Sequence, residues 1–237
     1  MAAVELTGIR FDARDADLIA TFWAQILDWR LQPAPGGAIA VLPTVPGSYP
    51  LLIDSADTPK RGQNRIHFDL TTTSAQAMQE LIAQALDLGA SHADVGQAAD
   101  VSHGVLADPE GNEFCVIEPE SWFLADTGAI GAINCDGSQA VGYFWSEVLQ
   151  WPLVWDQDEE TAIQAPIGGS KITWSGPPLM PRIGRDRLRF ELTALDPLPR
   201  DIADLAAKGA TIGIGPRSGQ QVVMLDPDGN EFHVVER

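Results

Sequence analysis

A histidine and an aspartate alternate with apolar side chains in the segment 65–71, which reads Arg-Ile-His-Phe-Asp-Leu-Thr. In a β-strand, residues two apart share a face, so His67 and Asp69 would lie together while the apolar residues between them face a core. Because imidazole titrates near neutrality, His67 can act as a general base or as a metal ligand. The alternative is a histidine that lines a cavity and hydrogen-bonds to Asp69.

A second position of interest lies in a hairpin motif that occurs twice. The segment Asp108-Pro-Glu-Gly-Asn-Glu-Phe-Cys-Val-Ile-Glu118 returns as Asp226-Pro-Asp-Gly-Asn-Glu-Phe-His-Val-Val-Glu236. Pro, Gly and Asn favour a tight turn, so this part of the motif predicts structure and not catalysis. The chemical difference lies one residue after Phe, at Cys115 and His233. Cys115 is expected to be a small buried side chain, because a reactive thiolate needs a nearby cation.

A further echo indicates that the whole chain is duplicated. The pattern Phe22-Trp-x-x-x-Leu-x-Trp29 returns as Phe144-Trp-x-x-x-Leu-x-Trp151, an offset of 144 − 22 = 122, and the hairpins are offset by 226 − 108 = 118. A repeat of this period predicts two tandem domains of ordinary size. We place them at residues 1–120 and 126–237, joined by a short linker around Trp122.

The composition describes a globular chain and excludes some partners. Of 237 residues, 45% are apolar and 20% charged, which fits two folded domains. With a net charge of −18, the chain is not expected to have the basic surface that nucleic-acid binding needs. No apolar run reaches the length of a membrane span and the N-terminus lacks signal-peptide features, so a cytoplasmic location is expected. Two cysteines do not indicate a disulfide framework.

Each half of the chain reads as a strand, a helix and three short strands, twice over. Helices are expected after Asp15 or Asp17 and after Ser74, which can cap them, and again from Ser138 and near Pro199. Gly and Pro clusters separate the short strands. The pattern predicts an α+β chain of four βαβββ modules, two in each half.

The tryptophan helix, the stretch Lys60-Arg-Gly-Gln-Asn-Arg-Ile-His-Phe-Asp-Leu70 and the twin hairpins together resemble the glyoxalase-like domains of the vicinal oxygen chelate superfamily. The resemblance covers essentially the whole chain. It implies tandem domains whose paired modules form a cupped, mostly antiparallel sheet, with helices outside and a ligand site in the concavity. In the superfamily's metal enzymes, carboxylate and imidazole ligands project from the first and last strands, and the metal acts as a Lewis acid. The function stays open, because one scaffold carries many chemistries.

The ligand positions that the resemblance implies are only partly filled in the first domain. His67 matches a metal histidine, but the counterpart in the first strand is Gly8, or Ile9 in a shifted register. The glutamate position holds Cys115, a soft ligand that suits zinc better than nickel, magnesium, manganese or iron. A fourth position falls near Asp54. We expect no intact metal site here, with His67 and Cys115 as the remaining candidates and a divalent metal in the first domain as the alternative.

The second domain offers fewer donors still. Its corresponding positions read Ile130, Arg189, Gly176 or Ser175, and His233. Arg189 carries a permanent positive charge that repels a metal ion, and Glu191 shares its face, so an Arg189–Glu191 pair is expected. Trp155 and Trp174 lie in strands, where their rings can either line the cavity and stack on a planar ligand or face the helices instead. We expect this domain to be metal-free.

Three functions are compatible with these residues. The first is a metal-independent protein that binds a small organic molecule, and the second is an enzyme of the superfamily, such as a glyoxalase-type lyase, an isomerase or a dioxygenase, working around His67. The third is a regulatory protein that binds a partner. The expected partner is a small molecule, not nucleic acid or membrane, and the chain is expected to be a pseudo-dimeric monomer or a homodimer. The residues expected at the ligand are His67, Asp69, Cys115, Asp54, Arg189, Glu191, His233 and Trp174.

Overall fold

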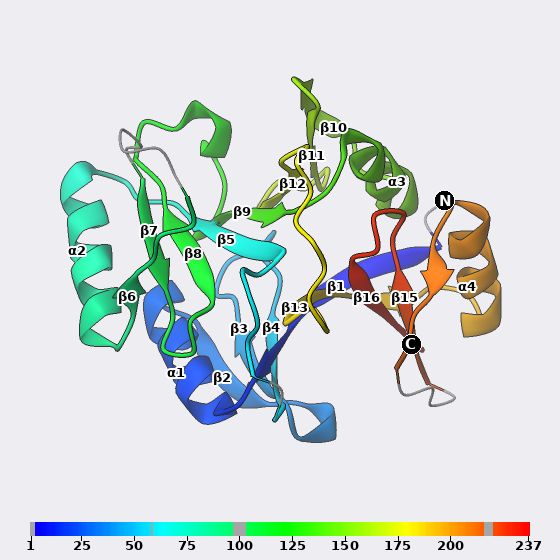
Figure 1. Cartoon of the computed structure of the whole chain (residues 1–237), viewed down its shortest axis with the longest axis horizontal. Coiled ribbons are helices and arrows are strands. Elements are labelled where there is room, and N and C mark those ends of the chain that lie inside the picture. The colour runs from blue at the N-terminus through cyan, green and yellow to red at the C-terminus, as the bar shows by residue number, and fades with distance from the viewer. Residues whose placement is uncertain (1–2, 58, 97–102, 216–219) are drawn as a thin grey trace.

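The computed structural model describes residues 3–57, 59–96, 103–215 and 220–237. It contains the four βαβββ modules that the sequence predicts, so the α+β class is confirmed. We number the modules 1 to 4 in chain order, and Figure 1 shows how they are arranged. No helix within these ranges is long and apolar enough to cross a membrane.

The element bounds follow the repeat closely. Module 1 consists of β1 (Val4–Ala13), α1 (Ala16–Leu27), β2 (Arg30–Pro33), the 3-10 turn η1 (Pro35–Gly37), β3 (Ile39–Leu42) and β4 (Leu51–Ser55). Module 2 consists of β5 (Ile66–Leu70), α2 (Ala75–Asp87), β6 (Ser91–His92), β7 (Gly104–Ala107) and β8 (Glu113–Val116), and is followed by η2 (Trp122–Leu124). Module 3 consists of β9 (Ile130–Cys135), α3 (Gln139–Leu149), β10 (Leu153–Gln157), β11 (Glu160–Gln164) and β12 (Lys171–Trp174). Module 4 consists of β13 (Leu188–Ala194), α4 (Leu198–Ala207), β14 (Thr211–Ile212), β15 (Gln221–Leu225) and β16 (Glu231–Val235).

Each of the two sheets takes one module from each half of the chain. Sheet A joins modules 1 and 4 in the order β14-β15-β16-β13-β1-β4-β3-β2, and sheet B joins modules 2 and 3 in the order β10-β11-β12-β9-β5-β8-β7-β6. The modules meet through antiparallel pairs of their first strands, β1 with β13 and β5 with β9. Within a module, the first and last strands are parallel, so both sheets are mixed. The division of the sequence near residue 120 stays a prediction.

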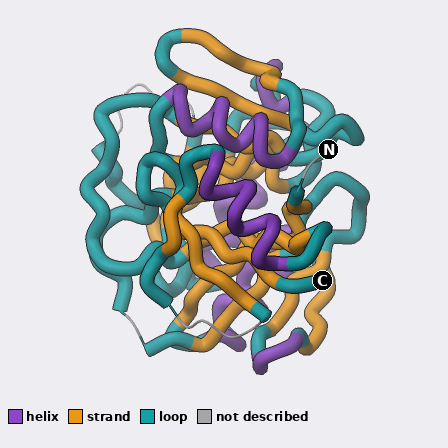
Figure 2. The backbone as a smooth tube through the Cα atoms, turned by 90° about the vertical axis from the view of Figure 1, so that its right-hand side faces the viewer, coloured by secondary structure: helices purple, strands orange, loops and turns teal. Residues whose placement is uncertain are grey.

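One face of each sheet packs into a common apolar core, and the other face is concave and open. We call the open face of sheet A cup A and that of sheet B cup B. Strand β5 shows the division, because Ile66, Phe68 and Leu70 are buried while His67 and Asp69 on the other face are only partly covered. Seen from the side, helices lie over the strands (Figure 2). This alternation is the one predicted from the sequence.

Helix α1 joins the two sheets through one tryptophan. The helix packs against β3 and β4 of sheet A. Its Trp23 ring also meets Phe68 and Phe114 of sheet B edge to face, with ring centroids 5.2 Å away in each case. Edge-to-face pairs of buried rings add to the energy of apolar burial. Trp23 therefore holds module 1 against module 2, which lies in the other sheet.

Helix α3 repeats this arrangement in the second half. It packs against β11 and β12 of sheet B. Its Trp145 ring meets Phe190 and Phe232 of sheet A, at centroid distances of 5.1 and 5.0 Å. The repeated tryptophan motif thus marks the two places where consecutive modules contact each other across sheets.

The repeated hairpin supplies the polar partner of each tryptophan. Trp23 Nε1 donates to Asp108 Oδ2 at 3.3 Å, and Trp145 Nε1 donates to Asp226 Oδ2 at 3.1 Å. Each carboxylate also accepts hydrogen bonds from its own turn, for example from Asn112 in the first hairpin. Burial raises the pKa of both aspartates, and the donated hydrogen bonds oppose that rise.

The hairpins also hold the start of the helices. Glu110 accepts backbone hydrogen bonds from Arg14 and Asp15 at 3.0 and 2.6 Å, just before α1. Asp228 accepts one from the backbone N–H of Ser138 at 2.6 Å, just before α3. Carboxylates are favourable at a helix N-terminus, where the backbone N–H groups are unpaired. The hairpins are therefore clasps between modules as well as turns.

We expect loss of the indole donor to destabilise the fold at equivalent places in both halves. Trp23→Phe and Trp145→Phe keep an aromatic ring but leave a buried carboxylate with one fewer donor, at a cost of about 1–3 kcal/mol each. Urea unfolding followed by circular dichroism measures this. Trp29→Phe is the matched control, because Trp29 is buried and its indole has no hydrogen bond within the described residues. An equal loss of unfolding free energy in all three variants would contradict the role given to the two indole hydrogen bonds.

Candidate functional site

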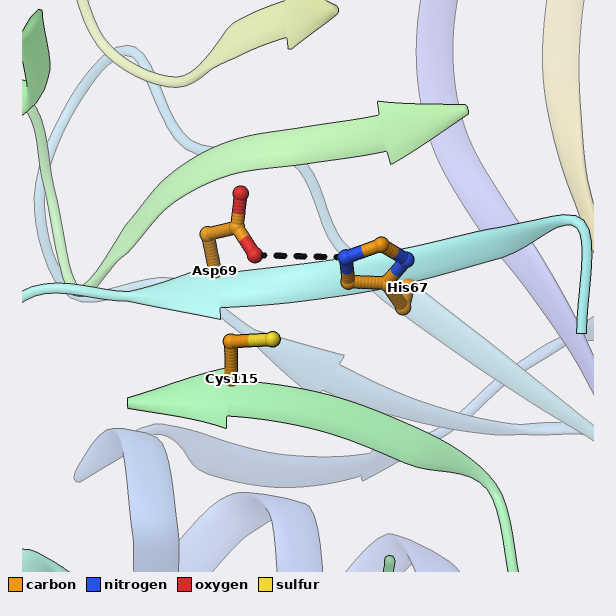
Figure 3. A group of neighbouring side chains, drawn as sticks. All are labelled: His67, Asp69 and Cys115. Atoms are coloured by element: carbon orange, nitrogen blue, oxygen red, sulfur yellow. Dashed lines mark ion pairs between the residues drawn. The ribbon is translucent and has the colours of Figure 1, made fainter. Parts of the chain in front are cut away.

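Three potential ligand atoms converge on the floor of cup B. His67 and Asp69 project from β5 and Cys115 projects from the neighbouring β8, all toward the same side of the sheet (Figure 3). Asp69 and Cys115 are direct neighbours in the parallel pairing of the two strands. The imidazole, carboxylate and thiol atoms lie within 4.8 Å of one another. His67 Nε2 is 3.4 Å from Asp69 Oδ1.

This donor set suits a borderline or soft transition metal such as zinc. It offers nitrogen, oxygen and sulfur, a combination that zinc accepts and that oxygen-preferring cations do not. Burial and the adjacent, hydrogen-bonded Asp69 carboxylate raise the pKa of the Cys115 thiol far above its ordinary value. The thiol is thus protonated at neutral pH, and a metal would have to displace that proton. The residues can hold zinc at this cost.

A cavity of about 290 Å³ opens beside the cluster. Its floor is polar and is formed by Asp69 of β5, Asn134 of β9 and Ser175 after β12, with the hydroxyl of Ser175 3.2 Å from Asn134 Oδ1. Thr173 also lines it, is 9% exposed, and its hydroxyl has no hydrogen-bond partner within the described residues. The cavity therefore offers hydrogen-bonding groups that the protein itself leaves unused.

Three aromatic rings form one wall of this cavity. Trp155 of β10 lies 5.7 Å from Trp122 and 6.0 Å from Phe123, centroid to centroid. Trp122 is 71% exposed, so it stands at the mouth of the cavity and not in the core. Lys171 Nζ lies 4.3 Å from the Phe123 ring centroid and donates a hydrogen bond to the Phe123 carbonyl oxygen. We call Trp122, Phe123 and Trp155 the aromatic wall.

Cup A is built on the same plan, but an arginine lies at its centre. The Arg10 guanidinium is bound on one side by Asp54, at 2.6 Å, and on the other by Glu191. Burial lowers and the two carboxylates raise the pKa of Arg10, and the net result is a rise. A permanent cation therefore occupies the space between the carboxylates, and a metal ion does not fit there.

The strand registers give each position of cup A a counterpart in cup B. Arg10 faces Arg189 across the β1–β13 pair as Asn134 faces His67 across the β9–β5 pair. Glu191 lies beside His233 as Asp69 lies beside Cys115. With the residue of cup A given first, the counterparts are Arg10 and Asn134, Arg189 and His67, Glu191 and Asp69, His233 and Cys115, and Asp54 and Ser175.

The residues proposed from sequence are therefore divided between the two cups. His67, Asp69 and Cys115 come together in cup B, whereas Asp54 lies in cup A, because β1 and β4 belong to a different sheet from β5 and β8. Arg189, Glu191 and His233 also lie in cup A. Trp174 is 1% exposed and packs toward Gly142 of α3, although it borders the cavity of cup B.

The expected pair between Arg189 and Glu191 does not form. Arg189 is 1% exposed and donates to both oxygens of Asp12, at 2.6 and 3.0 Å. Glu191 is bound by Arg10 instead. Arg189 pairs differently from the prediction because the Asp12 carboxylate, which comes from the adjacent strand β1, lies closer to its guanidinium than Glu191, two residues along its own strand.

Two parts of the site were not anticipated from sequence. Trp122 and Phe123 belong to the segment read as a linker, and Arg10 and Asn134 were not singled out. The signal for the first pair was present, since two adjacent aromatic residues in a short linker are unusual there. No local signal marks Asn134, because its meaning depends on comparison with Arg10 in the other sheet.

Comparison with known proteins agrees with the fold. The sequence model of the family described as Glyoxalase-like domain matches residues 8–117 and 131–235. No curated protein matches the chain. Glyoxalase I from Zea mays has a similar structure, with 13% identity, a TM-score of 0.70 and coverage of 98% of this chain and 92% of that one. A putative dioxygenase from Bacillus subtilis gives 13% identity, a TM-score of 0.60 and coverage of 99% and 86%. At these identities the structures support the fold alone.

The buried histidine of cup A should make the fold sensitive to acid. Burial lowers the pKa of His233 from its ordinary value of about 6.5. Below that value the unfolded chain takes up a proton that the folded chain resists, so stability falls as the pH falls. The neighbouring Glu231 has a lowered pKa despite its burial, and its contribution is lost at still lower pH.

We expect the midpoint of thermal unfolding to drop between about pH 7.5 and about pH 5.5, and to drop less in His233→Gln. Glutamine keeps a polar partner for Gln221, which hydrogen-bonds His233 Nδ1 at 2.6 Å. His92→Gln, at an exposed position on β6, is the control and should follow the unmodified chain. An identical pH dependence in all three proteins would exclude His233 as the cause.

Proposed function

The chain belongs to the glyoxalase-like domain family, and from that premise we propose that it binds a small organic molecule in cup B. The observation that carries the proposal is the aromatic wall beside a polar floor. Ligand sites are mostly apolar concavities with a few placed polar groups, and the cavity of about 290 Å³ has both. Trp122 supports the idea further, because a ring exposed by 71% has no role in the core.

Cup A is the weaker candidate although its cavity, about 670 Å³, is larger. Its two central carboxylates, Asp54 and Glu191, are already bound by the Arg10 guanidinium, so neither lacks a cationic partner. Among the described residues, its lining has no aromatic side chain and consists mostly of small apolar groups and polar side chains such as Gln32. Size alone does not create affinity, whereas stackable rings and unpaired polar groups do. We therefore assign the ligand to cup B.

The second candidate is a zinc-dependent enzyme of the same superfamily, a lyase, isomerase or dioxygenase that works around His67. It is favoured by the convergence of His67, Asp69 and Cys115 within 4.8 Å. These three residues would hold the ion, and a bound zinc supplies Lewis-acid polarisation of a substrate oxygen. His67 would otherwise serve as a general base toward a ligand in the cavity. The cytoplasmic location and the choice between monomer and homodimer stay predictions from the sequence.

We expect two-ring aromatic probes to bind in cup B and to depend on Trp155. The probes are 2-methylquinoline, which is neutral at neutral pH, N-methylquinolinium, which is cationic, and 1-naphthoate, which is anionic. Trp155→Ala removes a stacking ring and should weaken the best probe about fivefold, as the loss of about 1 kcal/mol implies. Isothermal titration and ligand-observed NMR measure this.

The matched control for the probe experiment is Gln32→Ala. Gln32 occupies in cup A the place that Trp155 has in cup B, since each pairs with the corresponding alanine of the next strand. It should leave probe binding unchanged. The proposal fails if no probe binds, or if Gln32→Ala weakens binding and Trp155→Ala does not.

The zinc alternative predicts one zinc ion per chain, held by His67 and Cys115. Titration against a chromophoric chelator should show an affinity that rises with pH, because the Cys115 thiol must lose its proton. His67→Ala and Cys115→Ser should each weaken zinc binding by about tenfold or more. Replacing a residue that only hydrogen-bonds to a metal ligand already costs about 10-fold to 100-fold in metal affinity. His92→Ala, on exposed β6, is the control. Zinc binding that neither variant weakens would rule out this site.

A further inference from the structure

The two cups differ in whether the protein supplies its own central cation. In cup A, two carboxylates, Asp54 and Glu191, are bridged by the guanidinium of Arg10. In cup B the counterpart of Glu191 is Asp69, so a carboxylate remains at this position. The counterpart of Arg10 is Asn134, which is shorter and carries no charge. Cup B thus keeps a carboxylate and lacks the arginine that would neutralise it.

The carboxylate of Asp69 has no permanent cation as a partner. Within the described residues, its only charged-type contact is His67, at 3.4 Å, and no lysine or arginine pairs with it. The side chain of Asp69 is 13% exposed, so water only partly solvates it. Glu160, an exposed residue at the edge of the same cavity, adds negative charge and forms no ion pair within the described residues. Asp69 has the Cys115 thiol and His67 beside it but no permanent cation, so its negative charge is only partly compensated and attracts a cation.

The aromatic wall of the same cavity suits a cation as well. The faces of tryptophan and phenylalanine rings attract positive charge. The aromatic wall already shows this property, because the ammonium of Lys171 lies 4.3 Å from the Phe123 ring centroid. That ammonium is held by the Phe123 carbonyl oxygen, and Lys171 is not among the residues that line the cavity. It therefore leaves the rings of Trp122 and Trp155 available.

We propose that cup B selects an organic cation with a flat aromatic body, whose positive group takes the place that the Arg10 guanidinium has in cup A. The positive group lies against Asp69, Asn134 and Ser175, and the aromatic body lies against Trp122 and Trp155. The cavity has room for a body of about two fused rings. This proposal rests on the proposed function, and it adds the charge and shape of the ligand.

The charge of the probe should decide its affinity. N-methylquinolinium and 2-methylquinoline have the same number of heavy atoms and nearly the same shape, so their comparison isolates the charge. With EDTA present to exclude metal ions, we expect the cation to bind about tenfold more tightly than the neutral ring, and 1-naphthoate to bind least. Added salt should weaken the binding of the cationic probe and leave the affinity of the neutral probe nearly unchanged.

Two variants test the position of the charge. Asp69→Asn removes the carboxylate, keeps the shape, and should reduce the tenfold preference to about twofold or less. Asn134→Arg installs in cup B the residue that cup A has, so its guanidinium should pair with Asp69 and abolish cation binding. Gln32→Ala in cup A is the control and should leave the preference intact. Thermal unfolding checks that each variant is folded.

The outcomes separate this inference from the proposed function. If 2-methylquinoline or 1-naphthoate binds as tightly as N-methylquinolinium or more tightly, and the binding still depends on Trp155, the preference for a cation is overturned. The proposal of a ligand site in cup B then still stands. A cation preference that survives both Asp69→Asn and Asn134→Arg would also overturn it. Failure of every probe to bind would overturn the proposed function itself, and the inference with it.

Discussion

Two buried hydrogen bonds, each from an indole to a carboxylate, hold the architecture together. The donors are Trp23 and Trp145 on helices α1 and α3, and the acceptors are Asp108 and Asp226 in the hairpins that precede β8 and β16. Each bond joins one module to the next module in the chain, which belongs to the other sheet. The two sequence motifs recur at similar spacing because they are the two halves of one contact. A tryptophan without its aspartate would bury an unpaired donor, and an aspartate without its tryptophan would lose part of the compensation for its own burial.

This contact determines where ligand sites can form. Because the two modules of each half are held back to back, each sheet is completed by a module from the other half, and each cup combines positions that lie far apart in the chain. The duplicated chain therefore has two cups whose corresponding positions carry different side chains. Cup A became a closed ion-pair network around Arg10 and Arg189. Cup B has His67, Asp69 and Cys115 on its floor, and its aromatic wall comes from the linker and from β10.

The sequence was informative wherever the deciding interactions were local. The alternation around His67 placed its apolar neighbours in the core and His67 with Asp69 in the cup, and Asp15 and Ser74 cap their helices as predicted. It was not informative about which modules share a sheet, because β1 pairs with β13 across more than half of the chain. Asp54 was grouped with His67 for that reason. The partner of Arg189 was misjudged likewise, since Asp12 approaches it from a neighbouring strand.

The contrast between the cups follows from a general conflict between stability and binding. A site whose charged groups already pair with one another is stable and has little left to offer a ligand, which describes Arg10 between Asp54 and Glu191. A site whose carboxylate lacks a permanent cation gives up stability that a ligand can restore, and linkage requires that such a ligand stabilise the fold by the same interaction. The difference between the two cups comes down to one position, which holds Arg10 in cup A and Asn134 in cup B. The shorter, uncharged asparagine removes the internal cation and also leaves the space that its side chain would fill. The fused chain can tolerate that loss in cup B, since the core around Trp23 and Trp145 and the ion pairs of cup A do not depend on it.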